Sequence, residues 1–156
     1  MKKLLPVALF LSLIVLAAFA VRINVTVDDE ADRQAVREAV LDYVEGIYEV
    51  APERIERSVH PHLAKVGYWR AKEAATYDEG RMTYEQLVAL AGQWNAKGRV
   101  DAETAPKEIE IFDLMDQTAT VKLSAHWGVD YMHLAKIEGK WTIMNVLWQS
   151  YPPEAQ

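Results

Sequence analysis

The chain has 156 residues, a formal net charge of −6 at pH 7 and no cysteine. This acidic balance argues against a nucleic-acid partner, because binding to the phosphate backbone needs a basic surface. A sequence without cysteine excludes disulfides, a thiolate nucleophile and Cys-ligated metal sites. The length suits one domain with a single hydrophobic core.

The N-terminal segment from Met1 to Ala20 differs in composition from the rest. Lys2 and Lys3 precede an uncharged apolar stretch, and Ala18-Phe19-Ala20 matches the small-x-small pattern that signal peptidase accepts. We predict a signal peptide at residues 1–20 and export to the periplasm or beyond, which leaves a more acidic mature chain. The alternative is an uncleaved anchor that holds the domain at the membrane, since the apolar stretch approaches the length of a membrane span.

Residues 21–28 are predicted to be a linker, residues 29–151 one domain, and residues 152–156 a tail. The domain begins with a helix over 29–49, in which apolar residues recur at three- and four-residue spacing. A short second helix begins at Pro52, since proline is favoured at the first helical position, and must end near His60 before a further proline.

The middle of the chain contains one further helix. Residues 64–69 predict a strand, although Gly67 weakens it, and residues 70–81 predict a loop. Thr83 and Gln86 form a capping box that opens a third helix, which we expect to end near Gly98.

After Pro106 the apolar period changes from 3.6 to 2, which predicts strands. The expected strands are centred on residues 109–111, 120–127, 130–137 and 141–149, with Glu138-Gly139 as the turn of the last hairpin. Short connections make neighbouring strands antiparallel, and helices followed by a meander give an α+β fold.

The order of these elements resembles the nuclear transport factor two-like superfamily, and within it the branch called putative lumazine-binding, which is related to polyketide cyclase-like and ketosteroid isomerase-like proteins. The matching motifs are Leu41-Asp42-Tyr43-Val44-Glu45-Gly46, His60-Pro61-His62-Leu63-Ala64-Lys65 and the segment from Asp130 to Trp148. The resemblance implies a cystatin-like cone, in which a curved antiparallel sheet wraps around the long N-terminal helix and leaves an apolar pocket open at one end. The superfamily includes enzymes, binding modules and adaptors, so the fold alone does not specify chemistry.

Our leading hypothesis is an exported, non-catalytic domain that binds a small hydrophobic or planar ligand without a cofactor. Ligand pockets are lined mainly by apolar and aromatic side chains, and this chain offers several at positions expected to face the cone. The competing interpretation is that these side chains only fill the core. The expected lining residues are Tyr43, Ile47, Tyr68, Trp94, Trp127 and Trp148.

A second hypothesis is an isomerase, cyclase or dehydratase. Ketosteroid isomerase-like enzymes use a carboxylate base, but this chain has no Asp or Glu between Arg57 and Arg70. His62 could replace that base, with Tyr48 as the phenol donor, because imidazole titrates near neutral pH. This hypothesis requires His62 to point into the cone, whereas a solvated His62 would count against it.

Three further interpretations concern other surfaces of the domain. His126 and Asp130 could meet across a hairpin turn as an acid–base pair, or could simply fix the strand register. Two imidazoles in His60-Pro61-His62 could bind a metal, but we expect no metal site because further ligands are scarce. The third hypothesis for function is a structural module that forms a homodimer through the open face of the sheet.

Overall fold

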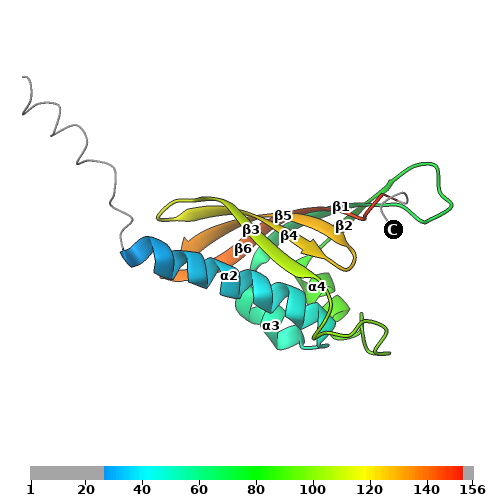
Figure 1. Ribbon diagram of the computed structural model, residues 1–156, viewed down its shortest axis with the longest axis horizontal. Coiled ribbons are helices and arrows are strands. Elements are labelled where there is room, and N and C mark those ends of the chain that lie inside the picture. Colours follow the sequence, from blue (N-terminus) through cyan, green and yellow to red (C-terminus); the bar gives the residue numbers. More distant parts are fainter. Residues whose placement is uncertain (1–26, 153–156) are drawn as a thin grey trace, which may run out of the picture.

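The structure is a computed structural model that describes residues 27–152. The predicted signal peptide and most of the predicted linker and tail lie outside these residues. In chain order the elements are α2 (Val27–Tyr48), α3 (Pro52–Ser58), β1 (Val59–Trp69), β2 (Asp78–Met82), α4 (Tyr84–Ala91), β3 (Lys107–Leu114), β4 (Thr118–Ala125), β5 (Gly128–Ile137) and β6 (Lys140–Gln149) (Figure 1).

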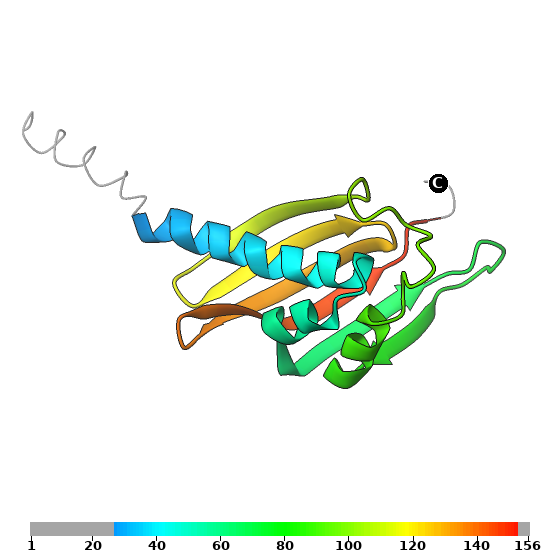
Figure 2. The ribbon, with the colours of Figure 1, turned by 90° about the horizontal axis from the view of Figure 1, so that it is seen from below.

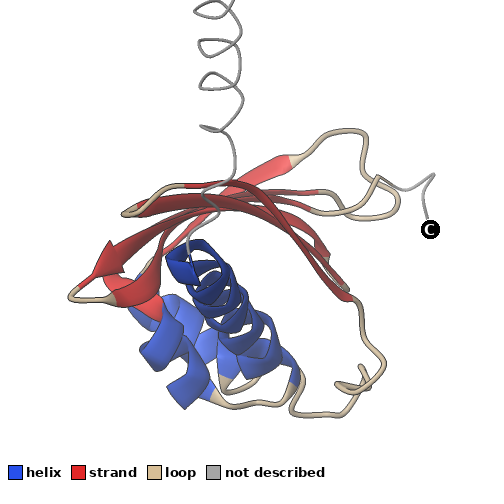
Figure 3. Cartoon of the chain, turned by 60° about the vertical axis from the view of Figure 1, so that its left-hand side comes forward, coloured by secondary structure: helices blue, strands red, loops and turns tan. Residues whose placement is uncertain are grey.

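The strands form one six-stranded sheet in the order β2-β1-β6-β5-β4-β3. The sheet arches over the helices, which all lie against its concave face (Figure 3). This arrangement confirms the α+β fold and the antiparallel meander of β3 to β6. One pairing differs from the expected antiparallel sheet, because β1 runs parallel to β6.

Two boundaries in the middle of the chain differ from the sequence prediction, and one strand there was not predicted. The strand β1 begins at Val59 rather than at residue 64, so His60 and the residues after it are extended. The strand β2 occupies part of the predicted loop. It lies at the edge of the sheet with four of its five residues exposed, and therefore shows no apolar period. The capping box of Thr83 and Gln86 is present, but α4 ends at Ala91 instead of near Gly98.

The hairpin between β5 and β6 has the predicted turn. Glu138 and Gly139 both have positive φ, at 51° and 79°. This pair of dihedral angles is the signature of a type I′ turn, whose twist matches that of the two flanking strands. The glycine is therefore required by the backbone conformation at this position.

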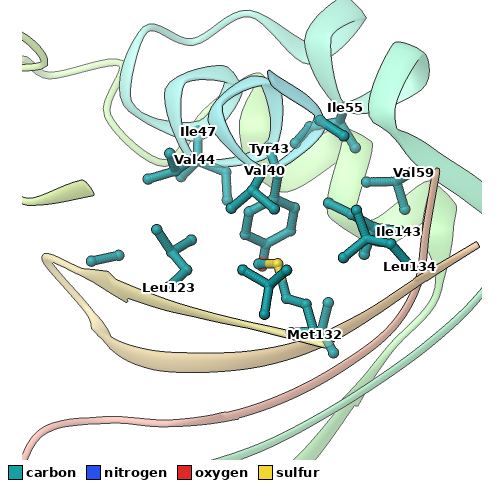
Figure 4. Packing of buried hydrophobic residues seen from close by; sticks show 14 of the residues in the cluster. Val40, Tyr43, Val44, Ile47, Ile55, Val59, Leu123, Met132, Leu134 and Ile143 are labelled. Carbon is teal, nitrogen blue, oxygen red and sulfur yellow. The ribbon is translucent and has the colours of Figure 1, made fainter. Parts of the chain in front are cut away.

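The core lies between α2 and the concave face of the sheet (Figure 4). The apolar stripe of α2 is fully buried at Val40, Tyr43 and Val44, and it packs toward Leu123 of β4 and Met132 of β5. Removing each such side chain from water stabilises the fold by about 1.5–3 kcal/mol. The hydrophobic effect therefore sets the position of α2 across the sheet (Figure 2).

A polar contact also fastens the first turns of α2 to the last hairpin of the sheet. Asp32 accepts hydrogen bonds from Lys136 Nζ at 3.0 Å and from Trp141 Nε1 at 2.9 Å. These bonds hold the pKa of the Asp32 carboxyl below its usual range, the lysine having the larger effect.

Among residues 27–152, no helix has the length and apolar character needed to cross a membrane.

Candidate functional site

A cavity of about 220 Å³ lies between the C-terminal half of α2, the region of α4 and the concave face of the sheet. Aromatic and aliphatic side chains make up nearly all of its wall. Among the described lining residues, Lys65 alone carries a charge. The lining residues are Tyr43, Ile47, Lys65, Met82, Leu90, Trp94, Trp127 and Trp148.

The regular periods of the helix and the strands direct these side chains inward. Tyr43 and Ile47 lie four residues apart on one face of α2. On β1, Lys65 and Gly67 share the buried side of the strand. Gly67 pairs with Trp148 in the parallel register, and a Cβ at position 67 would collide with the Trp148 indole. Glycine at this position therefore makes room for the ring that forms one wall of the cavity.

Trp127 is the centre of an aromatic cluster in the wall of the cavity. Its ring centroid lies 5.4 Å from that of Tyr48, 5.5 Å from that of Trp94 and 6.4 Å from that of Tyr43, all in edge-to-face geometry. Such pairs contribute about 0.5–1.5 kcal/mol each beyond the area that they bury. The aromatic walls are therefore held in place before a ligand arrives.

A buried polar cluster forms the floor of the cavity. Lys65 Nζ donates a hydrogen bond of 2.7 Å to Tyr43 Oη and lies 3.8 Å from Asp130 Oδ1. Trp127 Nε1 donates to the other carboxylate oxygen of Asp130 at 3.0 Å. The ammonium group also lies 5.4 Å from the ring centroids of Tyr43 and Trp148, a distance typical of cation–π contacts.

Burial acts on both charges of this cluster. The Lys65 side chain is 5% exposed and that of Asp130 is 0% exposed. Desolvation raises the pKa of the Asp130 carboxyl and lowers the pKa of the Lys65 ammonium, while their mutual attraction opposes both changes. Burial also raises the pKa of the Tyr43 phenol, which therefore stays protonated. Asp130 Oδ1 has no hydrogen-bond partner among the described residues.

Five of the six residues predicted to line the pocket do line the cavity. The sixth, Tyr68, is 38% exposed and donates a hydrogen bond to Glu79 on the neighbouring strand β2. It lies one position beyond Gly67, and alternation along β1 therefore turns its side chain away from the cavity.

The two residues considered for catalysis lie outside the cavity wall. His62 is exposed on β1, on the side of the strand opposite to Leu63 and Lys65. Tyr48 is buried, and its hydroxyl donates to Pro106 O and accepts from His126 N, both at 2.7 Å. Burial raises the pKa of Tyr48 to about 12. The hydroxyl of Tyr48 thus connects α2 to two loops, and this contact stabilises the fold.

Asp130 does not form the pair that the sequence suggested. Its side chain points to the inner face of β5 and accepts a hydrogen bond from Trp127, whereas His126 is exposed in the turn before it.

The sequence did not indicate that Lys65 belongs to the site, because a lysine in a strand usually lies on the solvent side. Its burial could have been predicted from its position between Leu63 and Gly67, because every second residue of a strand faces the same side.

Within residues 27–152, no group of three His, Cys, Asp or Glu side chains has a spacing suited to a metal ion.

Comparison with known proteins supports the fold. The sequence profile of the family described as putative lumazine-binding matches residues 31–149. No curated protein matches the sequence significantly. A nuclear transport factor two-like protein of unknown function from Silicibacter pomeroyi superposes with a TM-score of 0.62 at 16% identity, over 79% of this chain and 98% of that one.

Two other solved structures are similar. A nuclear transport factor two-like protein of unknown function from Shewanella baltica gives a TM-score of 0.59 at 16% identity, over 83% of this chain and 99% of that one. A putative scytalone dehydratase from Novosphingobium aromaticivorans gives 0.51 at 10% identity, over 80% of this chain and 87% of that one. At such identities the likeness concerns the fold alone.

Proposed function

Because the chain belongs to the putative lumazine-binding family and has the nuclear transport factor two-like fold, we propose that the domain is a receptor for a small planar molecule. The ligand lies in the cavity between α2, α4 and the sheet. The observation that carries this proposal is the preformed space of about 220 Å³ walled by three tryptophans and a tyrosine.

The size of the cavity limits the ligand. An engineered apolar cavity of about 150 Å³ holds benzene, and pockets for drug-sized ligands have about 300–1,000 Å³. A volume of about 220 Å³ lies between these values. The ligand is therefore expected to have one or two fused rings, with any longer substituent extending out of the open end.

The chemistry of the wall limits the ligand further. Rigid aromatic side chains contact a flat ring at little cost in conformational entropy. Lys65 and Tyr43 lie next to each other in the lining and supply an ammonium and a hydroxyl group. A flat apolar ring with one oxygen atom directed toward Lys65 fits this distribution. Lumazine carries polar atoms around its whole edge, many of which would lose their water without gaining a partner.

Titration calorimetry with 2-naphthalenemethanol tests the proposal. We expect saturable binding of one molecule per chain, and weaker binding of lumazine. The variant Leu90→Trp fills the cavity from α4 and should abolish binding. The variant Ile137→Trp is the matched control, because Ile137 lies at the exposed far end of β5. Equal binding by the two folded variants would refute the location of the site.

We also propose that the domain functions outside the cytoplasm, supported by the lysine pair, the apolar stretch and the cleavage pattern of residues 1–20. Expression of the full chain in a bacterium, followed by fractionation and N-terminal sequencing, tests this. A mature N-terminus at Val21 in the periplasmic fraction is expected. An intact N-terminus in the membrane fraction would support the anchor instead.

A further inference from the structure

We propose that Lys65 captures a planar aldehyde or ketone in the cavity as a reversible imine, with Asp130 taking the proton that the amine must lose. The inference rests on the proposed function, because the carbonyl compound has to enter the same cavity. It adds a chemical class to the ligand and a covalent role to a lysine.

The position of Lys65 suits a nucleophile better than it suits a structural cation. The residue lines the cavity, so a ligand there reaches its amine without moving the sheet. The aromatic rings of Tyr43 and Trp148 lie 5.4 Å from the nitrogen, and the side chain is only 5% exposed, so the amine is largely removed from water. Desolvated lysines in apolar pockets are the ones that form imines with carbonyl substrates.

Asp130 supplies a place for the proton. Its Oδ1 lies 3.8 Å from Lys65 Nζ and lacks a hydrogen-bond partner among the described residues. Moving a proton from the ammonium to this oxygen removes two buried charges at once, so burial reduces the free-energy cost of the transfer. Burial shifts the pKa values of both groups toward this exchange. Trp127 holds the other oxygen and so keeps the carboxyl group oriented.

The reaction is balanced with these groups alone. Lys65 transfers one proton to Asp130, and its free electron pair forms a bond to the carbonyl carbon as the carbon–oxygen π bond opens. The carbonyl oxygen receives the proton held by Asp130 and a second proton from the attacking nitrogen. The remaining carbon–oxygen bond then breaks, and water leaves. One ammonium group and one carbonyl compound thus give one protonated imine and one water, with no oxidant or reductant.

The aromatic wall selects the class of carbonyl compound. Trp94, Trp127 and Trp148 surround the space next to Lys65, so the carbonyl must be attached to a flat, apolar ring or a conjugated chain. Sugars and small polar aldehydes would lose their hydration without compensation. The matching ligand is therefore an aromatic or conjugated aldehyde or ketone, bound reversibly and released by hydrolysis.

Reductive trapping tests this inference. The purified protein is incubated with 2-naphthaldehyde and sodium cyanoborohydride, and the modified lysines are located by peptide mapping and mass spectrometry. Excess 2-naphthalenemethanol has the same ring system but no carbonyl, and serves as the competitor. We expect labelling of Lys65 to saturate, to run about tenfold faster than that of exposed lysines and to fall about tenfold with the competitor.

Two variants test whether the competitor-sensitive label is on Lys65. Lys65→Met should remove the competitor-sensitive label, whereas Lys140→Met, which alters an exposed lysine of β6, should leave it unchanged. If Lys65→Met does not fold, the peptide map of the unaltered protein decides the question alone. Binding of 2-naphthalenemethanol without competitor-sensitive label on Lys65 would overturn the imine and leave the proposed function intact. Absence of any binding would overturn both.

Discussion

Replacing Lys65 by methionine removes the positive partner of the Asp130 carboxylate, which has no exposure to solvent. Methionine has nearly the length of lysine, so the change removes the charge and little of the volume. The negative charge that remains keeps the hydrogen bond from Trp127 and the nearby Tyr43 hydroxyl, but no cation among the described residues. We therefore expect a large loss in the free energy of unfolding at pH 7.

The magnitude follows from the geometry. Two unit charges 3.8 Å apart attract each other by about 4 kcal/mol at an effective dielectric constant of about 20. Breaking one side of a buried ion pair costs about 3–5 kcal/mol, because the other charge stays buried. We expect Lys65→Met and Asp130→Asn each to cost about 3 kcal/mol. The double variant should cost about as much as either single variant, since it leaves no uncompensated charge.

Urea unfolding of the four proteins, followed by circular dichroism, measures this cycle. The predicted coupling free energy between positions 65 and 130 is about 3 kcal/mol. The matched control is the surface pair of Lys122 and Glu110, 3.5 Å apart and partly exposed, with an expected coupling below about 1 kcal/mol. Single-variant costs that add within about 0.5 kcal/mol at the buried pair would refute the reasoning.

Three further variants test other contacts. Gly67→Ala should displace the Trp148 ring and cost about 1–3 kcal/mol, with a clear loss of 2-naphthalenemethanol affinity in calorimetry; unchanged affinity would contradict the role given to that wall. Tyr48→Phe should cost about 1–3 kcal/mol in urea unfolding, because two part-buried hydrogen bonds, to the Pro106 carbonyl and from the His126 amide, are lost at about 0.5–1.5 kcal/mol each. Trapping at position 65 should survive this change, and its loss in a folded protein would indicate a chemical role for the phenol. Asp32→Asn should cost about 1 kcal/mol or less. Because the Lys136 bond lowers the Asp32 pKa, this difference is present above about pH 4 and vanishes as the pH falls through the lowered pKa; a difference that grows in acid would contradict this sign.

Local patterns predicted most of the elements correctly. The stripe on α2, the capping box at Thr83 and the turn at Glu138-Gly139 each depend on neighbours within a few residues, and each is present. The strand β2 was missed because an exposed edge strand carries no apolar period. The parallel contact of β1 with β6 joins segments that are far apart in the sequence, so no local pattern could indicate it.

The residues of the site could also be predicted from the sequence only in part. Tyr43 and Ile47 could be assigned to the cavity from the helical period, and the tryptophans from their size. Tyr68 was placed wrongly and the side of His62 was left open, because the phase of β1 was unknown and one residue of shift turns a side chain to the other face. Lys65 and Asp130 lie on strands that are distant in the sequence, and the pair forms only when the sheet folds.

Entry of a planar ligand into the cavity can be observed directly, because the chain has five tryptophans whose indole groups report on their surroundings. The indole N–H signals in a two-dimensional nitrogen-15 NMR spectrum can be followed while 2-naphthalenemethanol is added. Trp94, Trp127 and Trp148 line the cavity, whereas Trp69 is exposed and Trp141 is bonded to Asp32. The prediction is that the first three signals move together and saturate while those of Trp69 and Trp141 stay in place. Movement confined to Trp69 or Trp141, or no movement at all, would contradict the account.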